Sequence, residues 1–386
     1  MVAESISLSA KRLAEARRVV LKIGSTLFVD QDSGTLHRSW LEALCADVAA
    51  MHADGQEVII VSSGAIALGA SELGADVGRA RLEEKQAAAA AGQIQLAHAY
   101  REILGDHGII AAQVLLTLDD SESKRRYYLN AANTLSTLLK CRAVPVVNEN
   151  DTVATQEIRD GDNDRLAARV AQMASADCLV LLSDVDGLYT CDPRTDSDAR
   201  HIPEVTELTD DYWDMAGGPG SSHGSGGMRT KLDAARIAMG AGCRTLIAQG
   251  QVARPLQAVH AGARVTWFLP TSTPRAARKQ WIAGTLQPKG RITIDDGAKV
   301  ALSAGKSLLP VGVTQVDGEF ERGDAVRVID SDGHELGRGL IAYGAADARA
   351  ISGQRSDAIA TILDYRGRDE MIHRDDLVLT HAETGS

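Results

Sequence analysis

The first strand-like run of the chain is VVLKIGST, from Val19 to Thr26, in which aliphatic residues lead directly into a glycine turn. A short β-branched run that ends at a turn residue predicts a strand buried on both faces. Helical patterns, for example over 39–53 and 83–104, separate this run from four similar ones. These runs lie at residues 57–61, 144–148, 178–182 and 244–248. Apolar strands that alternate with helices predict an α/β fold with a mostly parallel central sheet covered on both faces.

The pattern changes after about residue 250, and the length of 386 residues favours two domains because one hydrophobic core rarely grows that far. Prolines and a basic cluster over 261–288 predict a linker. From residue 289 onward, short alternating strands are separated by turn signals, which predicts a small β-rich domain over 289–386. We therefore expect an exposed lead-in at 1–17, an α/β domain at 18–260, the linker and the β-rich domain.

Composition excludes several classes of protein. The chain is 44% hydrophobic and 24% charged, and no window of about eighteen apolar residues could span a bilayer. Charges stand in the N-terminal segment where a signal peptide needs an apolar core, so we expect a cytoplasmic protein. Widely spaced cysteines without a CxxC pair favour reduced, structural thiols over a zinc site or disulfides; they are Cys45, Cys141, Cys178, Cys191 and Cys243.

A net charge of −11 repels nucleotides at long range, so a site for a phosphorylated ligand must supply its own positive charge. Lys22 is the first candidate, because a glycine turn follows it and lets the backbone approach a ligand. A solvated lysine at a strand end is the plainer alternative for this position alone. Ser63, in a strand–glycine–helix junction, offers a hydroxyl and free N–H groups to an anion, although a serine helix cap explains it equally well.

Two polar clusters follow the strand at 144–148. Asp151 ends the run NEND, and Asn163 belongs to GDND at the start of the next helix. Ligands of open α/β sheets bind at the carboxyl ends of strands, so Asp151 is a candidate for a substrate ammonium and Asn163 for amide contacts. Solvated turns with an Asn or Asp helix cap explain each cluster alone, but the pair exceeds what capping requires.

The run LSDVDGLYT, which contains Ser183 and Asp184, also follows an apolar strand. A calcium loop would need a glutamate at its last position and a helix on each side, so nucleotide contacts by the strand end fit better.

The strongest candidate is the glycine-rich run from Gly217 to Lys231, which leads into a helix. Consecutive glycine N–H groups can form an anion nest, and Lys231 adds a full positive charge one turn into the helix. The order GxxxxGK[ST] is absent, so this is not a Walker A loop. A flexible linker is the alternative reading of the same glycines.

Taken in order, VVLKIGST, VSSGAIALG, VPVVNENDTVAT, GDNDRLAA, LLSDVDGLYTCDPR and SGGMRTKLDAA resemble the motifs of the glutamate 5-kinases in the amino-acid kinase family. GRITIDDGA, SLLPVGV and HRDDLV resemble the PUA domain of many bacterial members, so the resemblance covers nearly the whole chain. It implies a three-layer α/β kinase domain over 18–260 and a PUA domain over 289–386. The implied reaction transfers the γ-phosphate of ATP, with Mg²⁺, to the γ-carboxylate of L-glutamate, giving L-glutamyl 5-phosphate and ADP in the first step of proline biosynthesis.

The resemblance also assigns site residues. Lys22 and Lys231 are expected on the ATP phosphates and Asp164 is expected to orient both, which makes these three the catalytic residues. The implied glutamate site is Ser63, Asp151 and Asn163, and no protein ligand of a metal is implied. The implied ATP site is Lys22, Ser183, Asp184, Ser225, Gly226, Gly227, Met228, Arg229, Thr230 and Lys231. A γ-carboxylate, with a pKa of about 4, is already ionised at neutral pH, so catalysis requires charge compensation and in-line positioning but no general base.

Family membership further implies feedback inhibition by proline, a homodimer or homotetramer, and coupling to a glutamate-5-semialdehyde dehydrogenase. The roles of residues 124–128 and 217–224 stay open. Acetylglutamate, aspartate and carbamate kinases share the fold, but NENDTVAT and GDND argue against them. An RNA-binding or RNA-modifying protein is the alternative from another class, since PUA-like domains occur there. Residues 289–386 hold 12 Lys and Arg against 17 Asp and Glu, a net charge of −5, so RNA binding is not expected.

Overall fold

The computed structural model describes residues 2–30, 34–76, 80–117, 125–153, 162–217, 227–284 and 287–380. The chain divides into two compact units. The first comprises residues 1–119 and 131–274, and the second comprises residues 120–130 and 275–386.

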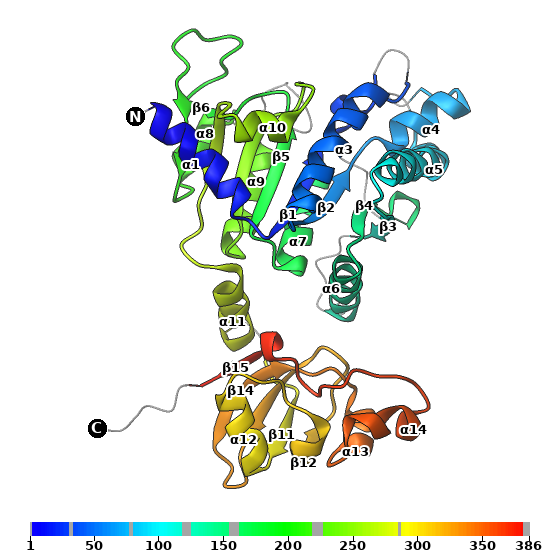
Figure 1. The fold of residues 1–386 in the computed structure, drawn as a ribbon, viewed down its shortest axis with the longest axis vertical. Helices are drawn as coiled ribbons and strands as arrows, with labels where there is room; N and C mark the ends of the chain where they lie inside the picture. The colour runs from blue at the N-terminus through cyan, green and yellow to red at the C-terminus, as the bar shows by residue number, and fades with distance from the viewer. Residues whose placement is uncertain are drawn as a thin grey trace. The chain divides into compact units, whose positions relative to one another are not determined.

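The first unit is built on a sheet with strand order β3-β4-β2-β1-β5-β9-β10-β8. Figure 1 labels the strands from β3 to β5 of this sheet. All pairs from β3 to β9 are parallel, whereas β10 is antiparallel to β9, so the predicted mostly parallel sheet is confirmed. The five predicted runs all form strands. The strands are β1 (Arg18–Ile23), β2 (Glu57–Ser62), β3 (Ala111–Leu116), β4 (Val144–Glu149), β5 (Cys178–Ser183), β8 (Glu204–Val205), β9 (Arg244–Gln249) and β10 (Val265–Phe268).

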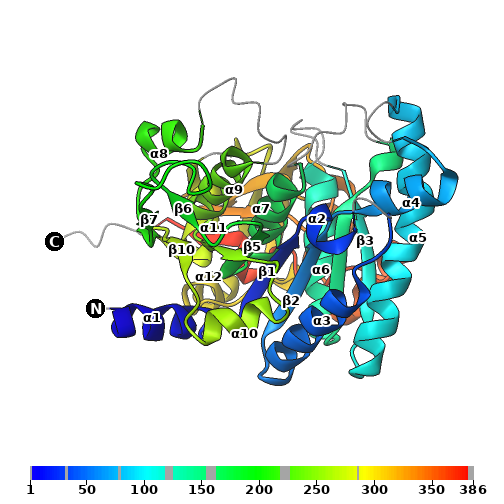
Figure 2. The same ribbon diagram turned by 90° about the horizontal axis from the view of Figure 1, so that it is seen from above.

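Helices cover both faces of this sheet because every second residue of a buried strand points to the opposite face. In β1, Val19 and Leu21 belong to one core cluster and Val20 to the other. Figure 2 shows α3 and α10 along one side of β1 and α7 and α9 along the other. The three-layer α/β architecture is thereby confirmed. One layer contains α1 (Val2–Ala14), α2 (Ser25–Phe28), α3 (Arg38–Ala53), α4 (Ala65–Leu73), α5 (Leu82–Asp106) and α10 (Pro255–His260), and the other contains α6 (Arg125–Lys140), α7 (Asp162–Ala174), α8 (Asp210–Met215) and α9 (Met228–Gly240).

Two segments carry more regular structure than expected. The 1–17 segment contains helix α1, whose Leu13 is fully buried and whose Ser9 hydroxyl accepts a hydrogen bond from the Trp267 indole at 3.0 Å. The charged residues of this segment led to the expectation of an exposed lead-in, because composition alone does not reveal an amphipathic pattern. The 261–288 segment contains β10 and helix α11 (Pro274–Gly284).

The second unit holds a five-stranded sheet of order β12-β11-β13-β14-β15, in agreement with the predicted β-rich domain. Its core contains Ile292, Val326 and Ile341, and a smaller cluster joins Leu129 to Ile282. The strands are β11 (Gly290–Ile294), β12 (Val313–Gly318), β13 (Ala325–Ile329), β14 (Glu335–Leu340) and β15 (Leu377–Leu379). Across the described parts of both units, no helix has the length and apolar character needed to cross a membrane.

Candidate active site

The predicted site residues that the structure describes in the first unit gather at one edge of the sheet. Parallel strands end at the same edge, and β1, β2, β4 and β5 end at Ile23, Ser62, Glu149 and Ser183. Helices α7 and α9 begin beside these strand ends, at Asp162 and Met228. The arrangement therefore brings together groups that are far apart in the sequence, such as Lys22 and Lys231.

A buried carboxylate between two lysines forms the centre of the site. Lys22 Nζ lies 2.6 Å from Asp164 Oδ1, and Lys231 Nζ lies 3.6 Å from Asp164 Oδ2. Thr230 also donates its hydroxyl to Asp164 Oδ2 at 2.7 Å. Asp164 is fully buried and each lysine is 7% exposed. Lysines in this setting are not solvated strand-end residues, so the plainer alternative for Lys22 is wrong.

Burial and charge act in opposite directions on these groups. Burial alone would raise the pKa of Asp164, but the charges of Lys22 and Lys231 and the hydrogen bonds to its carboxylate outweigh burial and hold that pKa below its ordinary value. Burial lowers the pKa of Lys231, which the nearby Lys22 charge also favours and the Asp164 charge opposes. The three groups together carry one net positive charge when all are ionised, which suits an anionic ligand.

A chain of amides lies next to this centre. Asn163 Nδ2 donates to Ser63 Oγ at 2.7 Å and to Asn148 Oδ1 at 3.3 Å. Asn148 Nδ2 in turn donates to Gln93 Oε1 at 2.8 Å. Because Asn163 adjoins Asp164 in α7, the amide chain and the lysine–carboxylate centre share one helix start.

The turn that carries Ser63 depends on a glycine. Gly64 has φ +107°, in the region that residues with a side chain rarely adopt, and a Cβ there would lie 3.2 Å from Phe28 and from Val29. The Ser63 backbone N–H donates to the carbonyl of Ile23 at 3.1 Å, which ties this turn to the end of β1. Gly64 also precedes α4, so the predicted strand–glycine–helix junction is confirmed.

Ser183 and Asp184 continue the edge beyond β5. Ser183 Oγ donates to Asp184 Oδ1 at 3.1 Å, and the Asp184 carbonyl accepts from Gln249 Nε2 at 3.2 Å. Arg194 Nη1 lies 3.7 Å from Asp184 Oδ2, which gives this part of the edge an additional cation.

The glycine-rich run is described from Gly227 onward, and the predicted residues Ser225 and Gly226 lie outside the described residues. Gly227 is the residue before α9, and its carbonyl accepts from the Thr230 hydroxyl at 2.9 Å. Met228 packs against the hydrophobic core. Arg229 turns toward Trp213, with its guanidinium 5.9 Å from the ring centroid, and donates to the Gly217 carbonyl at 3.3 Å. Of the described residues in this run, Thr230 and Lys231 are the two that contact Asp164.

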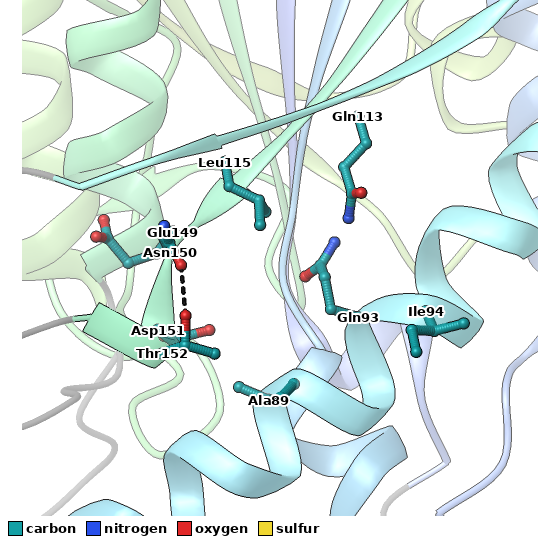
Figure 3. A pocket seen from close by; sticks show the side chains of 10 residues that line it. Ala89, Gln93, Ile94, Gln113, Leu115, Glu149, Asn150, Asp151 and Thr152 are labelled. Atoms are coloured by element: carbon teal, nitrogen blue, oxygen red, sulfur yellow. Dashed lines mark hydrogen bonds between the residues drawn. The ribbon is translucent and has the colours of Figure 1, made fainter. Parts of the chain in front are cut away.

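A cavity of about 270 Å³ opens between α5, strand β3 and the end of β4 (Figure 3). Asp151, in the short 3₁₀ helix η2 (Asp151–Val153), lines this cavity, whereas Ser63 and Asn163 do not. The amide side chains of Gln93 and Gln113 point into it (Figure 3). Gln93 therefore belongs both to the cavity wall and to the amide chain that leads to Asn163.

The position of Gln93 was not predicted from the sequence, because the residue lies in an alanine-rich helix whose pattern indicates only a core-facing surface. Strand β3, which supplies Gln113, was also not predicted. It is the edge strand of the sheet and is only partly buried, so it lacks a continuous apolar run.

Comparison with known proteins found two family models and several relatives that match this chain. The model of the amino acid kinase family matches residues 17–249, and the PUA domain model matches residues 290–363. The glutamate 5-kinase of Paramagnetospirillum magneticum is 63% identical over 95% of this chain and 99% of its own length. That of Rhodospirillum rubrum is 60% identical over 93% of this chain and 96% of its own. The solved structure of a carbamate kinase from Giardia lamblia bound to AMP-PNP covers 67% of this chain and 99% of its own, with 15% identity and a TM-score of 0.49.

The chain therefore belongs to the amino acid kinase family, within it to the group formed by its glutamate 5-kinase relatives, and it carries a C-terminal PUA domain.

Proposed function

We propose that this protein is a glutamate 5-kinase, which transfers the γ-phosphoryl group of ATP to the γ-carboxylate of L-glutamate and releases L-glutamyl 5-phosphate and ADP. The observation that carries the proposal is the pair of buried lysines on Asp164, beside the amide chain that ends at Asn163. Relatives of that name match nearly the full length of the chain.

The two lysines compensate the charge repulsion that opposes this reaction. The acceptor carboxylate is already ionised at neutral pH, so no residue has to remove a proton from it. Repulsion between that carboxylate and the triphosphate has to be compensated instead, and the ammonium groups of Lys22 and Lys231 supply fixed positive charge where the phosphoryl group moves. The low exposure of both lysines strengthens this effect, because little water screens their charges.

Asp164 acts on the lysines in this proposal. Its ionised carboxylate keeps two like charges close together before ATP binds, and Thr230 holds its second oxygen. Burial makes Lys231 easier to deprotonate than an ordinary lysine, and the arrival of a phosphate anion favours its charged form.

The remaining predicted residues divide between the two substrates. On the nucleotide side we assign Ser183, Asp184 and the run Ser225–Lys231, and on the glutamate side Ser63, Asp151 and Asn163. Mg²⁺ binds phosphate oxygens and retains several waters in such sites. Because both oxygens of Asp164 are engaged by cations or by Thr230, the described residues fit a metal carried by the nucleotide and not by a protein cage.

The setting of the enzyme completes the proposal. We infer a cytoplasmic homo-oligomer that acts in proline biosynthesis, is inhibited by proline, and passes its unstable acyl phosphate to a glutamate-5-semialdehyde dehydrogenase. The acidic PUA domain is assigned a structural or regulatory role, since its net charge of −5 does not favour RNA.

Trapping the acyl phosphate tests this proposal directly. The purified protein is incubated with ATP, Mg²⁺ and hydroxylamine, and hydroxamate formation is measured with L-glutamate, L-aspartate and N-acetyl-L-glutamate. Hydroxamate from L-glutamate in clear preference to the other two is the expected result. Absence of hydroxamate with all three substrates would contradict the proposal and favour the RNA-binding alternative.

A further inference from the structure

The side chain of Asn148, at the end of β4, has a fixed orientation. Its Oδ1 accepts a hydrogen bond from the backbone N–H of Glu149 at 2.9 Å. A backbone N–H can only donate, so the amide oxygen must face Glu149 and the NH₂ group must face the other way. That NH₂ group donates to Gln93 Oε1 at 2.8 Å, and the side chain is only 2% exposed.

The orientation of Asn148 determines that of Asn163. Because Asn148 presents an oxygen, Asn163 turns its Nδ2 toward it, at 3.3 Å, and the same Nδ2 donates to Ser63 Oγ at 2.7 Å. Asn163 Oδ1 then points elsewhere. It is buried and accepts no hydrogen bond from any residue in the described part of the chain.

A buried carbonyl oxygen without a donor is costly, so the donor is expected to come from a ligand. L-Glutamate at neutral pH carries only one group that donates hydrogen bonds, its α-ammonium, since both of its carboxylates only accept. The vacant acceptor on Asn163 therefore matches the ammonium end of the amino acid.

We propose that Gln93 is a positioning residue for the amino-acid substrate. By holding the NH₂ group of Asn148, it keeps the amides of Asn148 and Asn163 in the orientation that offers Asn163 Oδ1 to the substrate α-ammonium. This inference rests on the proposed glutamate 5-kinase activity and deepens it by adding a residue that lies outside the motifs quoted above. The Gln93 side chain itself lines the cavity between α5, strand β3 and the end of β4 (Figure 3).

Two substitutions at Gln93 distinguish the loss of its hydrogen-bond acceptor from a change in side-chain size. Gln93→Met keeps the length of the side chain but removes the oxygen that accepts from Asn148. Gln93→Glu keeps an acceptor at the same position. Gln95→Met is the matched control, because Gln95 lies on the same helix and its amide pairs with Glu72 at the surface.

The readout compares L-glutamate with glutarate, which has the same two carboxylates but no ammonium. The KM for L-glutamate, the inhibition constant of glutarate against L-glutamate, the KM for ATP and the melting temperature are measured for each variant. Gln93→Met is expected to raise the KM for L-glutamate by about 3- to 10-fold, the usual effect of one neutral hydrogen bond, and to leave the glutarate constant and the KM for ATP unchanged. Gln93→Glu and Gln95→Met are expected to retain the wild-type preference for L-glutamate over glutarate.

Three results would overturn the inference. The first is an unchanged KM for L-glutamate in Gln93→Met, and the second is an equal weakening of glutarate binding and L-glutamate binding in that variant. The third is loss of the preference for L-glutamate over glutarate in Gln93→Glu. If Gln93→Met does not fold, the Gln93→Glu variant decides alone, through the same preference. Failure of the proposed function would look different, because the wild-type protein itself would then form no hydroxamate from L-glutamate.

Discussion

Lys22 Nζ and Asp164 Oδ1 lie 2.6 Å apart at a position where the carboxylate is completely buried. A buried ion pair of this kind seldom exists for stability alone, because removing two charges from water offsets much of their attraction. The presence of Lys231 on the other oxygen of the same carboxylate leaves one positive charge uncompensated. Such an excess of buried positive charge is costly in the free protein and favourable once a phosphate is bound.

Replacing Asp164 by asparagine keeps the shape of the side chain but leaves two buried ammonium groups side by side. We expect Asp164→Asn to lower the free energy of unfolding by about 3–5 kcal/mol, the usual cost of breaking a buried ion pair, and to reduce kcat at least about 100-fold. Chemical denaturation and the hydroxamate assay measure the two effects. A variant with wild-type stability and kcat would show that the carboxylate does not hold the lysines in place.

The same substitution changes how stability depends on pH. The pKa of Asp164 is lower in the folded protein than in the unfolded chain, so its ionised form stabilises the fold above the unfolded pKa of about 3.9, and this contribution is lost as the pH falls through the folded pKa. We expect the free energy of unfolding of the wild type to fall more steeply below about pH 5 than that of Asp164→Asn. Parallel curves for the two proteins would exclude this source of acid sensitivity.

Activity should also decline on the alkaline side earlier than an ordinary lysine would require. Burial lowers the pKa of Lys231 in the free enzyme, and only its protonated form compensates phosphate charge. We therefore expect kcat/KM for ATP to fall with rising pH at a midpoint below the ordinary lysine value of about 10.4. Lys231→Arg, which stays charged throughout, should flatten this limb of the profile, whereas an unchanged midpoint in that variant would assign the limb to another group.

Substitution of Gly64, in the turn beside Ser63, is expected to lower the free energy of unfolding, and a second glycine, Gly74, provides the control. Gly64→Ala places a Cβ at φ +107° and 3.2 Å from Phe28 and Val29, so we expect it to destabilise the fold by about 1–3 kcal/mol and to raise the KM for L-glutamate. Gly74→Ala, at φ +65° with no atom within 4 Å of the added Cβ, should cost less and leave the KM unchanged. Equal costs in the two variants would rule out the close packing around Gly64.

Substitution of Trp213 is expected to change the KM for ATP alone. Its ring lies 5.9 and 5.7 Å from the guanidinium carbons of Arg229 and Arg236, and Arg229 also bonds the Gly217 carbonyl. We expect Trp213→Leu to raise the KM for ATP by about 3- to 10-fold, the effect of losing one cation–π contact, with little change in the KM for L-glutamate. Trp213→Phe, which retains an aromatic ring, is the control. A rise in both KM values in Trp213→Leu would indicate a general loss of structure instead.

The parallel strands and the group formed by Lys22, Asp164 and Lys231 could be predicted from the sequence for different reasons. Continuous apolar runs such as Val19–Ile23 predicted the parallel sheet because strands buried on both faces need apolar residues at every position. Lys22, Asp164 and Lys231 were found through their motifs, since no property of three separate polar residues reveals that they meet at 2.6 and 3.6 Å.

Neither the role of Gln93 nor strand β3 could be predicted from the sequence, for physical reasons. Gln93 acquires its role only through Asn148, which lies 55 residues away in the chain, and a polar residue in a helix carries no local sign of such a partner. The edge strand β3 has a half-exposed surface, and its pairing with β4 is a tertiary interaction that overrides its weak local pattern.

The most direct test of the central claim is kcat for hydroxamate formation in Lys231→Met, measured at saturating ATP, Mg²⁺ and L-glutamate and compared with wild type at equal melting temperature. Methionine keeps most of the side-chain volume and removes the charge, together with the ammonium group that lies on Asp164. If Lys231 compensates charge on the transferring phosphoryl group, kcat should fall by about 100- to 1,000-fold. A kcat within twofold of the wild type would contradict the account.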